Sequence, residues 1–183
     1  MALGDLTIIG DMTRTLGDLL TGLDVTFLSP AALDSASNDS FKRVNLYLYQ
    51  VLENPHAKNQ RWITGADGRQ QYPPLALNLY YLLTPYASDP LSAHDVLSSA
   101  MKALYEKSII SGADLRDSLR LSVEQLSVVL CPLGLEDLTR IWNALQKPYR
   151  LSVAYEARVV LVESDLRVAP ARVMVKKDVY QQS

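Results

Sequence analysis

The sequence predicts an α+β domain with a single, mostly antiparallel sheet of four to five strands that is flanked by about three helices. Two long segments, residues 43–55 and 73–87, have the two-residue alternation of β-strands and are rich in Leu, Tyr and Asn. Three other segments carry apolar residues at helical spacing. Hairpin-like and crossover links are mixed between these segments, which is typical of an α+β fold.

Three amphipathic helices are expected. The first covers residues 6–20, where apolar side chains recur every three or four positions. The second begins at Asp89 or Ser92, either of which can cap a helix, and runs to about Lys107. The third covers residues 135–145 and ends before Pro148, because the residue before a proline disfavours the helical conformation.

The two long segments form the centre of the predicted sheet, and both faces of each strand are partly apolar. Such a sheet is covered on both sides, here either by helices or by other subunits. A short extended piece at residues 25–30 precedes them. A third strand is predicted to begin with Leu119, Leu121 and Val123 and to end at an undetermined position before Pro132. A long fourth strand is predicted at residues 150–163. One face of this fourth strand is expected to carry Val153, Tyr155, Ala157, Val159 and Leu161.

The links divide the chain into a domain and an arm. Residues 34–40 are small and polar, which indicates a loop. Residues 54–74 form a long linker, and linkers of this length without structure of their own are usually functional or mobile. We expect residues 1–165 to form one domain and residues 166–183 to form an extended C-terminal arm that is β-capable but interrupted by Pro170.

Composition narrows the classes of function. The formal net charge is −2 and the sequence pI is near 5.7, which argues against nucleic-acid binding because such proteins usually carry a basic face. The N-terminus has acids where a secretory signal carries Lys or Arg, and the longest nearly uncharged stretch is too short to cross a bilayer as a helix. A single cysteine excludes an internal disulfide and fits a reducing compartment. A cytoplasmic protein without a membrane partner is expected.

The sequence shows little catalytic chemistry. His56 and His94 lack partners at metal-ligand spacing and are expected to be surface residues. Cys131 lies in an apolar context that raises a thiol pKa, so a buried structural cysteine is expected. Glu136 and Asp137 stand at the start of a predicted helix, where they favour the positive end of the helix dipole. No nucleotide-binding or serine-hydrolase motif occurs, and the prediction is a protein that is not an enzyme and has no cofactor and no metal.

The tyrosine content favours a role in contacts between subunits. Ten tyrosines stand against two phenylalanines, and five of the ten lie on the two predicted central strands. A tyrosine can bury its ring while its hydroxyl meets water or a partner, which suits surfaces shared between subunits. Any single tyrosine is more simply explained as core or sheet-edge filling, whereas the set favours interfaces.

Several segments together resemble one family. Five segments carry the resemblance, and they occur in a consistent order. They are Ser29–Pro30, RVNLYLYQVLENP from Arg43, PPLALNLYYLLTPYA from Pro73, LSSAMKAL, and IWNALQKPYRLSVAYEARVVL. They resemble the cap, or tail-terminator, proteins of phage-tail-like contractile injection systems. The resemblance implies a terminator-like fold that forms a ring, expected to be a hexamer, on the last ring of the inner tube and on the end of the sheath. Its partners would then be other copies of itself, the inner tube protein and the sheath protein, with assembly in the cytoplasm before any release of the particle.

A cap must bind the terminal ring with one face, and its opposite face must not bind a further ring, because head-to-tail stacking otherwise continues without limit. It therefore needs an adaptable docking element, for which the linker and the arm are the candidates. In the arm, Val173 and Val175 alternate with Met174 and Lys176, which suits addition of a strand to a neighbour's sheet edge; pairing with its own sheet is equally open. The predicted docking residues are Trp62, Tyr72, Val173, Val175, Lys176, Lys177 and Tyr180.

The function predicted on these grounds is a structural cap that ends the tube and the contractile sheath. A neck or connector adaptor of the same particle, which joins rings without ending them, is the first alternative. A small intracellular enzyme with an unrecognised site is the second, and the missing acid–base and nucleophile constellations count against it.

Overall fold

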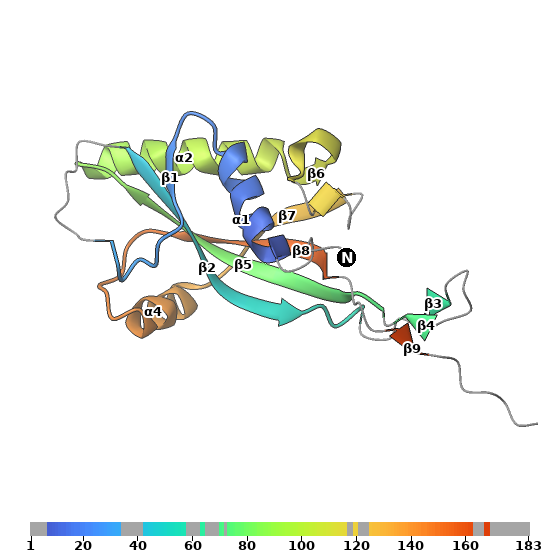
Figure 1. The fold of residues 1–183 in the computed structure, drawn as a ribbon. Helices are drawn as coiled ribbons and strands as arrows, with labels where there is room; N and C mark the ends of the chain where they lie inside the picture. The colour runs from blue at the N-terminus through green and yellow to red at the C-terminus, as the bar shows by residue number, and fades with distance from the viewer. Residues whose placement is uncertain are drawn as a thin grey trace, which may run out of the picture.

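A six-stranded, strongly twisted sheet organises the computed structural model, which describes residues 7–33, 42–57, 63–64, 70–71, 73–116, 119–120, 125–162 and 167–168 (Figure 1). Its strands lie in the order β1-β2-β5-β8-β7-β6. Parallel pairing joins β1 to β2, and the other neighbours pair antiparallel. The bounds of these strands are β1 Asp24–Thr26, β2 Arg43–Glu53, β5 Leu75–Tyr86, β6 Ile109–Ser111, β7 Gln125–Cys131 and β8 Val153–Val162.

Three helices flank the sheet within the described residues: α1 Ile8–Leu19, α2 Pro90–Glu106 and α4 Leu135–Ala144. Asp89 caps α2 by accepting a hydrogen bond from the backbone N–H of Ser92 at 2.9 Å, and Pro90 occupies the first turn, where its missing N–H costs nothing. The chain leaves α1 through Gly22, whose φ of 78° is one that glycine adopts without strain. A short 3₁₀ helix, Gly112–Asp114, follows β6. The α+β class and all three predicted helices are confirmed.

The helices cover the two faces of the sheet unequally. Both α1 and α2 lie on one face, while α4 lies on the other (Figure 1). The main core therefore forms beneath α1 and α2, with β2, β5 and β8 contributing Val44, Leu46, Leu77, Leu79, Tyr81, Leu83, Tyr155, Ala157 and Val160. On the other face, Leu138 and Trp142 of α4 pack against Leu82 in a much smaller cluster. The prediction that both faces are covered is confirmed for the parts of the sheet beneath these helices.

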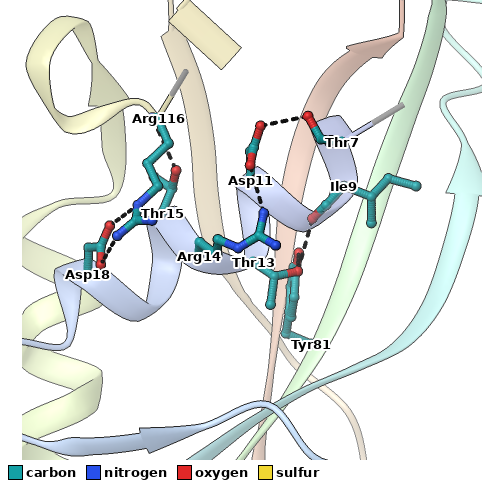
Figure 2. A network of polar contacts seen from close by, with 9 residues as sticks. All are labelled: Thr7, Ile9, Asp11, Thr13, Arg14, Thr15, Asp18, Tyr81 and Arg116. Carbon is teal, nitrogen blue, oxygen red and sulfur yellow. Dashed lines mark hydrogen bonds and ion pairs between the residues drawn. The ribbon is translucent and has the colours of Figure 1, made fainter. Parts of the chain in front are cut away.

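Hydrogen bonds fasten α1 to the sheet and to the loop after β6 (Figure 2). Thr13 donates its hydroxyl proton to the carbonyl of Ile9 at 3.0 Å, so the hydroxyl of Tyr81, also at 3.0 Å, is the donor to Thr13 Oγ1. Farther along the helix, Arg116 donates to both carboxylate oxygens of Asp18. These contacts fix how α1 sits on β5, because they hold two different parts of the helix.

Two β-bulges flank the central strand β5. On β2, Leu48 pairs with Tyr81 and Gln50 with Tyr80, so Tyr49 is an extra residue. On β8, Ala157 pairs with Leu79 and Val160 with Leu77, so two residues face Asn78. The second bulge corrects the face predicted for the fourth strand: Val153, Tyr155 and Ala157 lie on the core side, but beyond the bulge Val160 joins the core and Leu161 is only partly buried. The side chain of Val159 lies outside the described part of the structure.

The third predicted strand begins too early: a strand does precede Pro132, but it is β7, which starts at Gln125. Leu119 lies in a helical turn and is fully buried, while Leu121 and Val123 are outside the described residues. The strand next to β8 is β7, which starts later, and the short edge strand β6 was not predicted. The leucine spacing near residue 119 fits a period of two over only a few residues, and a run that short does not distinguish a strand from a helical turn.

A second, small sheet was also not predicted. It joins β3 Ile63–Thr64, β4 Gln70–Gln71 and β9 Arg167–Val168 in that order, and both pairings are antiparallel. The linker thus contains two short strands, and the arm begins with one that pairs with the linker of its own chain. The sequence predicted one sheet with four to five strands, whereas the described residues form one sheet of six strands and a second of three.

Tyr81→Phe tests the contact between α1 and the sheet. The substitution removes a donor from a fully buried site, so the free energy of unfolding should fall by about 0.5–1.5 kcal/mol. Urea unfolding followed by circular dichroism measures this change. Tyr105→Phe is the matched control, because that side chain is 82% exposed and its replacement should leave the midpoint unchanged. Equal midpoints for the two variants would contradict the role given to Tyr81.

Candidate docking site

The predicted docking residues lie outside the part of the chain that the structure describes: Trp62, Tyr72, Val173, Val175, Lys176, Lys177 and Tyr180. The structure nevertheless relates the two segments that carry them. Gln70 and Gln71 of the linker pair with Val168 and Arg167 at the start of the arm. The linker and the arm, predicted as separate docking elements, are thus joined in one small sheet near the end of β2 (Figure 1).

The end of β2 is poorly covered on both faces. Val51 pairs with Leu79 and therefore points to the face of α1 and α2, yet it is 40% exposed. Leu52 pairs with Asn78, points to the opposite face and is 46% exposed. Leu75 at the start of β5 is also exposed. Apolar side chains are therefore exposed on both faces of the sheet at this strand end.

An open cleft of about 630 Å³ lies on the α4 side of the sheet, beside this strand end. Its floor is polar and its rim includes the turn that follows β2. The lining residues are Leu52, Glu53, Asn54, Pro55, His56, Asn78, Tyr80, Glu156 and Arg158. Polar side chains on the floor explain how this part of the sheet face stays open although no helix of the described chain covers it.

Glu156 is the centre of the cleft floor and is 8% exposed. Its Oε1 accepts hydrogen bonds from Asn78 Nδ2 and from the Tyr80 hydroxyl, each at 2.9 Å. Its Oε2 accepts one from Arg158 Nε at 2.8 Å. A buried carboxylate is tolerated only when donors compensate it, and here two neutral donors and one cation do so. The bulge on β8 helps, because it places Arg158 beside the row that contains Asn78.

Asn54 extends this network to the linker. Its Nδ2 donates to Asn78 Oδ1 at 3.1 Å, and its Oδ1 accepts from the backbone N–H of His56 at 2.9 Å. The backbone N–H of Asn54 also donates to the carbonyl of Ala76. The first residues of the linker are therefore held rigidly against β5, which fixes the direction in which the linker leaves the domain.

Burial raises the pKa of Tyr49, Tyr80 and Cys131. Burial is the main cause that raises the pKa of Tyr49 to about 12, with smaller contributions from Cys131 and Tyr80. Burial and then the hydrogen bond to Glu156 raise the pKa of Tyr80. Burial and then the charge of Glu156 raise the pKa of the Cys131 thiol, as the apolar sequence context predicted, although the side chain is only partly buried. A protonated thiol is a weak nucleophile.

Other candidates for chemistry stay apart. Among the described residues, no three His, Cys, Asp or Glu side chains come close enough to hold a metal ion. His56 and His94 are exposed, as predicted. Glu136 and Asp137 lie in the first turn of α4, also as predicted. No helix in the described ranges has the length and apolarity needed to cross a membrane.

The tyrosines divide into two groups. Tyr81 and Tyr155 are core residues, whereas Tyr49 and Tyr80 stack at a tilt with ring centroids 6.3 Å apart beside the cleft. The residues that sequence reasoning missed are Asn54, Asn78 and Glu156. One signal was present: Glu156 and Arg158 place two charges in the middle of the predicted fourth strand, and a charge in a buried strand needs partners.

The fold is that of terminator proteins from contractile particles. The structure is similar to the sheath/tube terminator of an extracellular contractile injection system, PVC, in its extended state, with a TM-score of 0.64 and 20% sequence identity over 97% of this chain. It is also similar to the tube-terminating cap of the anti-feeding prophage, with a TM-score of 0.62 and 20% identity over 93% of this chain. The chain spans 64% and 60% of those two proteins, less than two thirds of either.

The family model of the Pvc16 N-terminal domain matches residues 7–176, and the chain belongs to this family. A search of curated proteins gave no match. The family resemblance inferred from the sequence is therefore confirmed.

Glu156→Gln tests whether the carboxylate holds the cleft floor together. Glutamine cannot accept from all three donors and leaves Arg158 without its counter-charge, so unfolding should become easier by about 1–3 kcal/mol. Glu136→Gln is the control, because that side chain is 80% exposed and its change should stay within about 0.5 kcal/mol. Chemical unfolding of both variants at neutral pH measures the difference; an unchanged stability for Glu156→Gln would remove the carboxylate from this structural role.

Proposed function

We propose that this protein is a structural cap that ends the inner tube and the contractile sheath of a contractile injection particle. The observation that carries the proposal is family membership over residues 7–176, joined to a fold shared over nearly the whole chain with two terminators. The protein acts by binding and not by catalysis. The raised pKa of the Cys131 thiol, which makes it a weak nucleophile, supports this.

In this proposal the protein works as a ring of identical copies, a hexamer, seated on the last ring of the tube protein and on the end of the sheath protein. It is assembled in the cytoplasm as part of the particle, and neither nucleic acid nor a membrane is among its direct partners. A closed ring needs two different surfaces on each copy that fit each other.

The small sheet and the segments that leave it form the proposed docking element towards the other partners. Trp62 and Tyr72 of the linker, together with Val173, Val175, Lys176, Lys177 and Tyr180 of the arm, remain the proposed contact residues. The pairing of β4 with β9 supports this, because it makes the two segments leave the domain from one place. Residues 1–165 then act as the rigid part and residues 166–183 as the adaptable arm.

Particles assembled without this protein test the function. If it is a terminator, tubes and sheaths should reach uncontrolled lengths, because nothing blocks addition of the next ring. Negative-stain electron microscopy of particles from cells with and without the gene gives the length distribution, and restoring the gene is the control. Normal lengths combined with a failure to join the next component would favour the connector adaptor instead. Particles that are unchanged in both respects would overturn a structural role.

A further inference from the structure

We infer that the exposed side chains of Phe27 and Leu28, where the chain leaves β1, bind the β6 side of a second copy of this chain, at Tyr105 and Ile109. The inference rests on the proposed ring and names the two different surfaces through which neighbouring copies meet. All four side chains are large and apolar, and they are between 43% and 82% exposed. A contact between them removes this apolar area from water.

The backbone that carries Phe27 and Leu28 is held firmly by the sheet. Asn45 of β2 is fully buried, and its Nδ2 donates hydrogen bonds to the carbonyls of Thr26 and Leu28 at 3.2 and 2.9 Å. The backbone N–H of Leu28 donates to Thr26 Oγ1 at 3.4 Å, and Pro30, just beyond, is buried. A segment that is ordered before binding loses little conformational entropy when a partner covers it.

The fold makes room for the Phe27 ring without burying it. A Cβ at Gly17 of α1 would lie 2.5 Å from Cζ of this ring, so any other residue there would push the ring away. One edge of the ring thus rests against α1, while 43% of the residue stays exposed. A large apolar side chain that is fixed on one side and open on the other suits an anchor residue of a protein interface.

The second surface follows from the geometry of a ring. In a closed ring of more than two copies, a surface of one copy meets a different surface of the next. β1 and β6 end the large sheet on its two opposite sides (Figure 1). The surface that receives Phe27 and Leu28 is therefore placed at β6, where Ile109 is 61% exposed and Tyr105, near the end of α2, is 82% exposed.

Side chains, and not backbone pairing, supply most of this contact. β1 and β6 have three residues each, and strands this short offer few hydrogen bonds to a partner. Ile110 of β6 is fully buried in the core, so the neighbouring Ile109 points to the other face of the sheet. Its side chain is therefore available to a partner without any change in the core.

Charge favours this partner over a like surface. Residues 27–41 contain two aspartates and no basic residue, whereas residues 102–113 contain two lysines and one glutamate. Contact between the β1 sides of two copies brings acids together, while contact with the β6 side brings opposite net charges together. The copies are thus directed to meet head to tail, as a ring requires.

Cross-linking tests which surfaces meet. In a Cys131→Ser background of the full chain, Leu28→Cys and Ile109→Cys are made as separate proteins, mixed, and treated with a short bismaleimide. The inference predicts a covalent dimer that needs both variants, and a ladder of higher species when one chain carries both cysteines. Leu135→Cys, which replaces a leucine that is 66% exposed at the start of α4, is paired with Ile109→Cys to give the background. A dimer no stronger than this background would overturn the inference.

Assembled particles show whether another component takes this surface instead. Benzophenone maleimide attached to Leu28→Cys, in the same background, is activated by light in purified particles, and mass spectrometry identifies the product. A product with a second copy of the chain supports the inference. Products with the tube or sheath protein alone would assign Phe27 and Leu28 to that partner and overturn it.

A charge exchange gives a second, independent measurement. Leu28→Lys and Ile109→Glu should each weaken self-association by about tenfold, because each buries a charge in an apolar contact. A chain with both substitutions should regain part of the loss, since each contact then joins a lysine to a glutamate. Analytical ultracentrifugation over a concentration series measures the constants, and unchanged unfolding midpoints show that the fold is kept.

Leu135→Lys is the matched control for the charge exchange, because it also replaces an exposed leucine and should leave association unchanged. Equal constants for Leu28→Lys and Leu135→Lys, no recovery in the doubly substituted chain, or a parent chain that does not associate at all would each contradict the contact.

These results can be separated from the proposed function. If the cross-link is missing but particles lacking the protein still grow to uncontrolled lengths, the cap survives and the contact between β1 and β6 sides fails. If the cross-link forms while particle length never depends on the protein, the contact stands and the cap fails.

Discussion

The structure depends on β5, which is paired on both sides and packed on both faces. Leu79 and Leu83 point towards α1 and α2, Leu82 points towards α4, and all three are fully buried. The Tyr81 hydroxyl of this strand is hydrogen-bonded to Thr13 of α1. Asn78 and Tyr80 of the same strand donate hydrogen bonds to Glu156 on the floor of the cleft. A displacement of β5 would disturb both layers at once, so this strand fixes the position of every other element around it.

The two faces of the sheet are covered to different extents. Two helices bury one face, whereas α4 has ten residues and reaches only part of the other. Where α4 ends, the chain replaces apolar side chains with a compensated carboxylate and two asparagines. This choice keeps the face open without exposing a broad apolar patch, which would bind partners without selectivity. Beside the cleft, the exposed apolar area is confined to the strand end, where Val51 and Leu52 lie.

The sequence predicts the parts of the fold whose pattern is long. The strands around Leu46 and Leu79 and the three helices each repeat their period over at least ten residues, which suffices to identify them. β6 has three residues, and β3, β4 and β9 have two each, so local pattern carries almost no information about them. The bulge at Arg158 depends on pairing with β5, a non-local contact that no local period reveals. For the same reason the network of Glu156 could not be predicted, because two of its donors, Asn78 and Tyr80, come from β5.

The two edges of the large sheet are both formed by short strands. β6 ends the sheet with three residues, and a strand this short offers few hydrogen bonds to a partner. β1 ends the opposite side, also with three residues, and it covers only the start of β2. Beyond β1, Val51 and Leu52 are exposed on opposite faces of the sheet. The pairing of β4 with β9 joins the linker to the start of the arm. The place at which the arm begins is therefore part of the fold.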